Sequence, residues 1–112
     1  MPMNINILGT KYQLVNQTSE QNPKIENCSG LCEPYAKKII IDTSPYADPE
    51  SVDNLDGYFH RVLRHEAFHA LFHEAGWSKY HEDEELVEAL AILYPRIREI
   101  MDALDSIDIG KI

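Results

Sequence analysis

The stretch His65-Glu66-Ala67-Phe68-His69 carries the strongest indication of how this sequence folds. Residues four apart lie on the same face of an α-helix, so His65 and His69 can direct imidazole nitrogens at one metal ion. Glu66 follows His65 by about 100° around the helix, where its carboxylate can hold and deprotonate a water molecule on that ion. The spacing therefore predicts a helical zinc site that carries its own general base.

The residues on either side of this motif predict the helix that it needs. Apolar side chains recur at helical spacing from Tyr58 to Leu71. Asp53 or Asn54 is expected to cap the start of the helix, and Gly76 is expected to end it as the first residue beyond the cap.

A second helix is expected to begin near His81 or Glu82, because apolar residues recur at helical spacing from Leu86 to Leu104. Pro95 falls inside this segment. Proline has no backbone N–H and crowds the carbonyl four residues before it, so Pro95 is expected to kink or split the helix.

The first part of the chain predicts β-strands. Residues 4–8 and 11–15 are β-prone on either side of Gly9-Thr10, which is typical of a hairpin, and the β-branched run 38–42 predicts a third strand. The polar segment 16–36 reads as a long loop with room for one short strand. We therefore expect an α+β fold in which a small N-terminal antiparallel sheet, hairpin plus edge strand, packs on the HExxH helix and on the second, Pro-kinked helix.

Composition limits the classes of function. At 112 residues the chain is expected to form a single domain, residues 1–112, and its formal charge of −9 argues against binding nucleic acid or an anionic membrane. No apolar run is long enough to cross a bilayer, and residues 1–9 do not resemble a signal peptide, so the expected compartment is the cytoplasm. Cys28 and Cys32 are one residue further apart than a redox CxxC pair and are expected to be free thiols.

A catalytic zinc site usually takes three protein ligands and leaves one position for water. The metzincin pattern is excluded, because positions 72 and 75 hold Phe and Ala. Glu84 and Glu88 are four apart on the second helix, so Glu84 can serve as the third ligand while Glu88 orients a ligand histidine from behind. Glu85 remains the alternative third ligand.

A plainer interpretation is an ordinary amphipathic helix with His65 and His69 at the rim of its apolar face. That arrangement would leave two histidines and several carboxylates half-buried without partners, which is unfavourable. The metal site is therefore the preferred interpretation.

With these residues in view, the sequence resembles small gluzincin-type metallopeptidases of phages and bacteria, relatives of the ImmA/IrrE proteins. The resemblance is carried by five blocks of sequence, of which the third contains the motif: residues 7–12, 30–32 with 38–41, 62–70, 84–91 and 93–97. It implies a minimal zincin-like fold in the cytoplasm of a bacterial or phage-infected cell.

The resemblance also implies roles for individual residues. His65, His69 and Glu84 would bind Zn²⁺, Glu66 would be the catalytic base, and Glu88 would stand where gluzincins often have an aspartate. The expected activity is hydrolysis of peptide bonds by Glu-assisted attack of zinc-bound water.

Strand 38–42 would then be the edge strand that pairs with an extended peptide or protein substrate, a repressor-type regulator being one candidate. Tyr80, His81 and Tyr46 are the candidates for stabilising the transition state, and the sequence does not choose among them. The alternative function is a zinc-stabilised module of phage origin that binds a peptide or protein with little or no turnover. The oligomeric state stays open.

Overall fold

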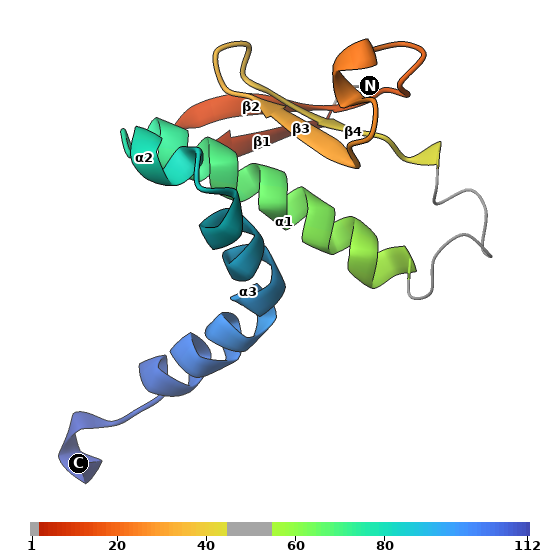
Figure 1. Cartoon of the computed structure of the whole chain (residues 1–112). Coiled ribbons are helices and arrows are strands. Elements are labelled where there is room, and N and C mark those ends of the chain that lie inside the picture. The colour runs from red at the N-terminus through yellow and green to blue at the C-terminus, as the bar shows by residue number, and fades with distance from the viewer. Residues whose placement is uncertain (1–2, 45–54) are drawn as a thin grey trace.

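The computed structural model describes residues 3–44 and 55–112 of the chain. A four-stranded sheet covers one side of a long helix, α1 (Leu55–Glu74), and a second long helix, α3 (Glu84–Asp105), packs on α1 and then projects away from the body (Figure 1). A single helical turn, α2 (Ser78–His81), lies between them. The chain is therefore of the α+β class, as predicted.

The predicted hairpin is present. Strands β1 (Met3–Ile7) and β2 (Thr10–Asn16) pair antiparallel, and Ile7 lies opposite Thr10. The two residues between them, Leu8 and Gly9, both have positive φ, as a type I′ turn requires. Such a turn matches the twist of the flanking strands, so this hairpin is specified locally.

The rest of the sheet differs from the prediction in two respects. Strands β3 (Gly30–Glu33) and β4 (Lys38–Ile41) complete a sheet of order β1-β2-β4-β3, in which β4 runs parallel to β2 and antiparallel to β3. The sheet is therefore mixed, and the prediction of an antiparallel sheet was wrong. The predicted edge strand, residues 38–42, is also a wrong assignment, because β4 lies inside the sheet, whose edge strands are β1 and β3.

The sequence of β4 explains why this strand lies inside the sheet. Ile39, Ile40 and Ile41 are all buried, so both faces of this strand are covered, which is typical of an interior strand rather than an edge. A parallel β2–β4 pair requires a crossover. The segment between the two strands provides it, contains the short 3₁₀ helix η1 (Pro23–Ile25), and adds β3 on the outer side of β4.

The core forms where the sheet meets α1. Side chains from β1, β2 and β4 pack against one side of the helix, and the buried members of this cluster are Ile7, Tyr12, Ile39, Ile41, Val62 and Ala70. Tyr12 and Ala70 are wholly buried. The sheet therefore holds α1 along its length and leaves the opposite helix faces to α3 and to the site described below.

Helix α1 ends as predicted. Gly76 has φ of +79°, its N–H bonds the carbonyl of His73, and the N–H of Trp77 bonds the carbonyl of Phe72. These two bonds form a Schellman motif, completed by packing of the Trp77 ring on Phe72. The predicted capping residues at the other end, 53 and 54, lie outside the described residues.

The second long helix begins later than predicted. Asp83 caps α3 by accepting a hydrogen bond from the N–H of Leu86, so the helix starts at Glu84 rather than at residue 81 or 82. Pro95 lies inside α3, which continues unbroken to Asp105, so of the two predicted effects of this proline, a kink or a split, the split is excluded. Among the described residues no helix combines the length and the apolar character needed to cross a membrane.

Candidate metal centre

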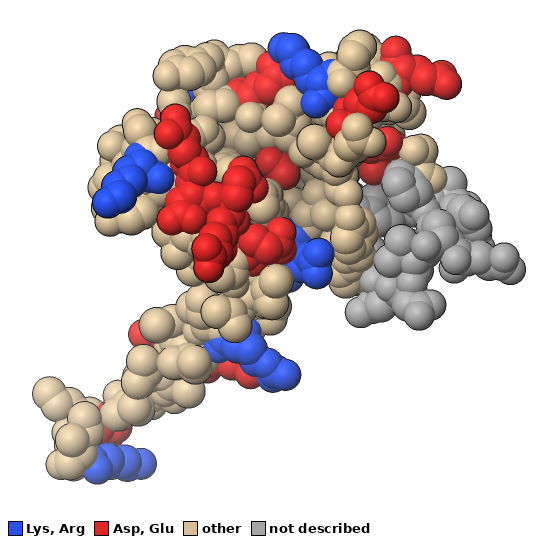
Figure 2. Space-filling view, in the orientation of Figure 1, with Lys and Arg blue, Asp and Glu red and all other residues tan. Residues whose placement is uncertain are grey.

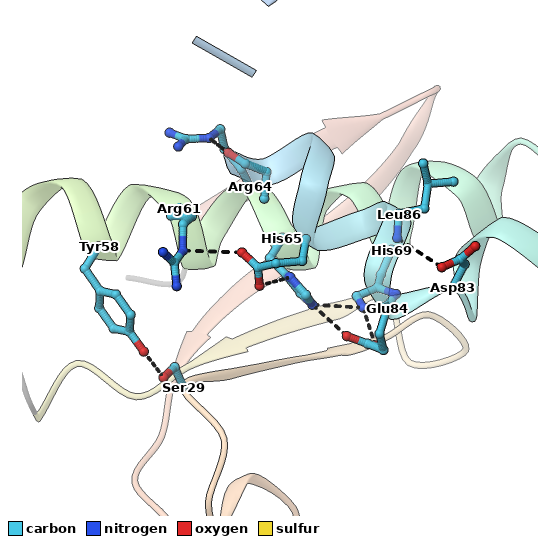
Figure 3. Close-up of polar contacts among 11 residues, drawn as sticks. Ser29, Tyr58, Arg61, Arg64, His65, His69, Asp83, Glu84 and Leu86 are labelled. Atoms are coloured by element: carbon cyan, nitrogen blue, oxygen red, sulfur yellow. Dashed lines mark hydrogen bonds and ion pairs between the residues drawn. The ribbon is translucent and has the colours of Figure 1, made fainter. Parts of the chain in front are cut away.

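His65 and His69 lie one turn apart on the face of α1 that points towards α2 and α3 (Figure 3). Their Nε2 atoms are 3.2 Å apart. Both residues are largely shielded from solvent, and His69 is buried. The helix thus directs two imidazole nitrogens at one point, as the four-residue spacing predicts.

Glu84 reaches the same point from the first turn of α3. Its Oε1 lies 2.8 Å from His69 Nε2, and its Oε2 lies 3.0 Å from His65 Nε2. The donor atoms of the three residues lie within 4.8 Å of one another, an arrangement that could hold a metal ion. Glu84 and Glu85 are both exposed, and the two short distances above are what bring Glu84, rather than the alternative Glu85, to the histidines.

With both imidazoles neutral and Glu84 ionised, the hydrogens available do not satisfy every contact in this cluster. His69 Nδ1 lies 2.6 Å from the carbonyl oxygen of His81, and a carbonyl only accepts, so Nδ1 carries the proton. Burial lowers the pKa of His69, which favours the neutral ring, and in that form Nε2 carries no proton. A proton on His65 Nε2 can serve Glu84 or His69, and in either case the 2.8 Å contact between His69 Nε2 and Glu84 Oε1 joins two acceptors.

A cation would resolve that conflict, and the spacing fits one. A tetrahedral zinc ion with bonds of roughly 2.0–2.1 Å has its ligand atoms about 3.3 Å apart. The 3.2 Å between the two Nε2 atoms lies close to that value, and Glu84 approaches the histidines through both oxygens, Oε1 at 2.8 Å from His69 and Oε2 at 3.0 Å from His65. Two imidazoles and a carboxylate are also ligands that zinc and several other divalent transition metals accept.

The second ring nitrogen of each histidine, Nδ1, contacts a different kind of group. Glu88, one turn after Glu84, places Oε2 3.1 Å from His65 Nδ1, and its Oε1 lies 3.3 Å from Arg61 Nε. Neither His65 Nδ1 nor Glu88 Oε1 forms a well-aligned hydrogen bond within the described structure, so these are close contacts without hydrogen-bond geometry. Such an outer carboxylate orients a ligating imidazole and increases its basicity.

His69 is held by the main chain instead. Its Nδ1 donates to the carbonyl of His81, and His81 Nδ1 in turn lies 2.8 Å from the carbonyl of His69. The Gly76 turn and α2 bring residue 81 back to α1 for this exchange. The tautomer of His69 is therefore set by backbone geometry.

Glu66 is buried, with 7% of its surface exposed, although glutamate is almost never buried without a partner. Burial raises the pKa of Glu66 to about 7, while the positive charge of His65 and a backbone hydrogen bond from Cys32 act in the opposite direction. Gly30 makes this packing feasible, because a Cβ there would lie 3.2 Å from Glu66 Cγ and 3.1 Å from Val62 Cγ1.

These groups line a cleft of about 630 Å³ between the edge strand β3 and the helices. His65, Glu66, His69 and Glu84 all contribute to its wall, and β3 contributes residues 30–32. Figure 2 shows acidic side chains gathered where α2 meets α3, beside this cleft. The acidic segment 82–88 that stands out in the sequence therefore borders the candidate site.

The three candidates for stabilising a transition state have different locations. His81 lines the cleft, whereas the Tyr80 ring packs against the rings of Phe72 and Trp77. Tyr46 lies outside the described residues. Cys28 and Cys32 also line the cleft and are free thiols, and burial raises the pKa of Cys32.

Sequence reasoning missed two arginines of α1. Arg61 lies one turn before His65 on the same helix face, a spacing that could have suggested its contact with Glu88. Arg64 Nε donates to the carbonyl of Ala91, a contact between helices that no local pattern indicates. Both are visible in Figure 3.

Comparison with known proteins found no family model, no curated protein and no solved structure that matches this chain. The resemblance to gluzincins therefore stays a prediction, and the candidate centre is judged on its own geometry.

Proposed function

We propose that this protein binds a divalent transition metal ion, zinc in the first instance, through His65, His69 and Glu84, and that it hydrolyses peptide bonds. The observation that carries the proposal is the convergence of two imidazole nitrogens and one carboxylate, from His65, His69 and Glu84, within 4.8 Å of one another. The buried Glu66 carboxylate beside these ligands supports the catalytic part.

A zinc ion held there would act as a Lewis acid, lowering the pKa of a coordinated water to about 7 and polarising a carbonyl group. Glu66 would accept a proton at its carboxylate and transfer it to the amine nitrogen that leaves. Glu88 would keep His65 in the ligating orientation, and the carbonyl of His81 would do the same for His69.

The cleft supports a peptide as substrate. Strand β3 lies at the edge of the sheet and its residues 30–32 line the cleft. An extended peptide can add to such an edge through main-chain hydrogen bonds. A substrate segment laid along β3 would pass beside Glu66 and the ligand histidines.

The first test is metal content. The purified protein, loaded with excess zinc and dialysed, is expected to keep one equivalent, and His65→Ala and His69→Ala are expected to lose it. His60→Ala is the matched control, because His60 is exposed on the same helix. A wild-type protein that retains no metal would reject the proposal.

The second test separates metal binding from catalysis. Glu66→Gln should keep stoichiometric zinc and lose the ability to cleave a mixed peptide library, as read by mass spectrometry. Glu85→Gln, which removes an exposed carboxylate nearby, should retain cleavage. Cleavage that survives Glu66→Gln would remove Glu66 from the mechanism. A zinc-loaded wild type that cuts nothing would favour the alternative, a zinc-stabilised module that binds a peptide or protein without turnover.

A further inference from the structure

A groove on the side of α1 away from the metal centre is lined by β1, α1 and α3. Its volume is about 490 Å³, and its wall includes Arg64, which extends away from the ligand histidines (Figure 3). Because β1 is an edge strand, the groove continues the apolar layer between sheet and helix beyond the last strand. Most of the other side chains that line it are apolar: Ile5, Ile7, Leu8, Phe68, Leu71 and Tyr94.

The outer edge of β1 has open main-chain groups. Ile7 and Thr10 flank the two-residue turn and form the closing hydrogen-bonded pair of the hairpin, and such pairs alternate along an antiparallel ladder. The N–H and C=O groups of Asn4 and Asn6 therefore point away from β2. Residues 3–7 include neither a charged residue nor a proline, which commonly protect an edge strand against pairing. This edge is therefore able to accept another strand.

Arg64 has no anionic partner among the described residues. Its Nε donates to the carbonyl of Ala91, and its other four N–H groups meet no acceptor in the described part of the chain. Arg64 is partly buried, and arginine is seldom taken far out of water unless its charge is paired. The two terminal nitrogens of a guanidinium match the two oxygens of a carboxylate. An occupant of the groove that carries a carboxylate would therefore complement this charge.

These features favour a segment of a different protein over a second copy of this chain. Two β1 strands paired edge to edge would bring no carboxylate to Arg64, because residues 3–7 are uncharged. They would also bring together two bodies that each carry a formal charge of −9. A small apolar molecule would fill the groove and leave the main-chain groups of Asn4 and Asn6 unpaired.

We propose that β1 and the groove bind an extended segment of another protein, which adds to the sheet as a fifth strand. The main chain of the segment pairs with Asn4 and Asn6. Its side chains at alternate positions are apolar and pack in the groove, and one aspartate or glutamate pairs with Arg64. At about 3.4 Å per residue, a segment of four or five residues matches the length of β1. This site is separate from the metal centre and does not depend on the proposed hydrolysis.

Selection from a library of random ten-residue peptides on the full chain tests the proposal. The library is first depleted on Asn4→Pro, because a proline there removes an outward N–H and blocks an added strand without removing a bond between β1 and β2. We expect the binders that remain to carry apolar residues at alternate positions and Asp or Glu at one fixed position. Asn4→Ala is the matched control, because it keeps the N–H, and it should bind these peptides as tightly as the wild type does.

The role of Arg64 has its own measurement. Changing the acidic residue of a selected peptide to the corresponding amide should weaken its binding to the wild type about 10-fold, because a charge-assisted hydrogen bond is lost. The same change should have little effect on binding to Arg64→Gln. An Arg64→Gln variant that is only less stable would bind both peptides less well by the same factor.

Circular dichroism shows whether each variant is folded, and the comparison at Arg64 does not depend on Asn4→Pro. A library that yields no binder, or binders without a shared acidic position, would overturn the proposal. A peptide pair with the same affinity ratio for wild type and Arg64→Gln would overturn it as well. Sedimentation tests the other occupant, because a dimer that is lost in Asn4→Pro would mean that a second copy pairs with β1.

Discussion

Arg64 donates a hydrogen bond from Nε to the carbonyl oxygen of Ala91, at 2.8 Å. That carbonyl would normally accept from the N–H of residue 95, but residue 95 is a proline and has none. An arginine of α1 therefore supplies the donor that α3 lacks. The contact also joins the helix that carries both histidines to the helix that carries Glu84.

Arg64→Met should lower the free energy of unfolding by about 1–3 kcal/mol, because the carbonyl of the buried Ala91 loses its partner while the apolar stem of the side chain is kept. Pro95→Ala should restore the bond within α3, so Arg64→Met should have a clearly smaller effect in that background. Urea denaturation of the four proteins measures the difference. Equal effects of Arg64→Met in both backgrounds would contradict the idea that Arg64 replaces the donor missing at Pro95. Arg98→Met, at an exposed arginine of α3, serves as the control.

Gly30→Ala should destabilise the protein by about 1–3 kcal/mol, the usual effect of overpacking. The added Cβ would lie 3.0 Å from Ile41 Cδ1 and 3.1 Å from Val62 Cγ1, so β3 would have to move away from α1. Thermal unfolding measures the change. Gly110→Ala provides the comparison, because the nearest neighbour of its added Cβ would be Asp108 Oδ1 at 3.4 Å in an exposed segment. A similar loss of stability in both variants would show that tight packing at residue 30 is not the cause.

Glu88→Gln should weaken zinc binding about 10–100-fold while leaving the three ligands in place, because His65 loses the carboxylate behind its Nδ1. Competition with a chelator of known affinity measures the dissociation constant. Glu85→Gln removes the same charge from an exposed position of the same helix turn and should leave the affinity nearly unchanged. If the two variants bind zinc equally well, Glu88 has no orienting role.

Glu74, at the end of α1, should make stability depend on acid pH. Its carboxylate accepts hydrogen bonds from Lys37 at 2.7 Å, Tyr12 at 2.6 Å and Thr10 at 2.9 Å, and these, Lys37 foremost, lower its pKa from 4.5 to about 2. A lowered pKa contributes stability that is present above the unfolded value near 4.5 and is lost as the pH falls towards 2.

Glu74→Gln should therefore reduce the free energy of unfolding at neutral pH by roughly 1–2 kcal/mol, and the difference from wild type should narrow as the pH falls below 4.5. Denaturation at a series of pH values measures this difference. Glu20→Gln, at an exposed position, should show no such trend. A difference that stays constant down to acid pH would mean that the charge of Glu74 contributes nothing.

The features that were predictable are those encoded by neighbouring residues. Alternation on either side of Gly9 indicates the hairpin, Gly76 indicates the end of α1, and the spacing of His65 and His69 indicates two imidazoles on one face. The shared helix face of Glu84 and Glu88 could be predicted for the same reason. In each case the physical signal lies within about two turns of helix or two strands.

The features that were missed depend on long-range pairing. Whether residues 38–41 pair with β2 or lie at an edge is decided by the path of the segment before them, which has no strong local pattern. The three consecutive buried isoleucines of β4 were a usable sign of an interior strand, since an edge strand open to water on one face would alternate. The contact between Arg64 and Ala91 joins residues 27 positions apart and was outside the reach of spacing arguments.

The reciprocal exchange between residues 69 and 81 implies an asymmetry in how this centre tolerates mutation. Residue 81 orients its histidine through a peptide oxygen, which every amino acid possesses, so many substitutions there should preserve the ligand's alignment. Residue 88 orients the other histidine through a side chain that few amino acids can replace. Evolution could therefore vary one wall of the cleft freely while the opposite wall stays fixed.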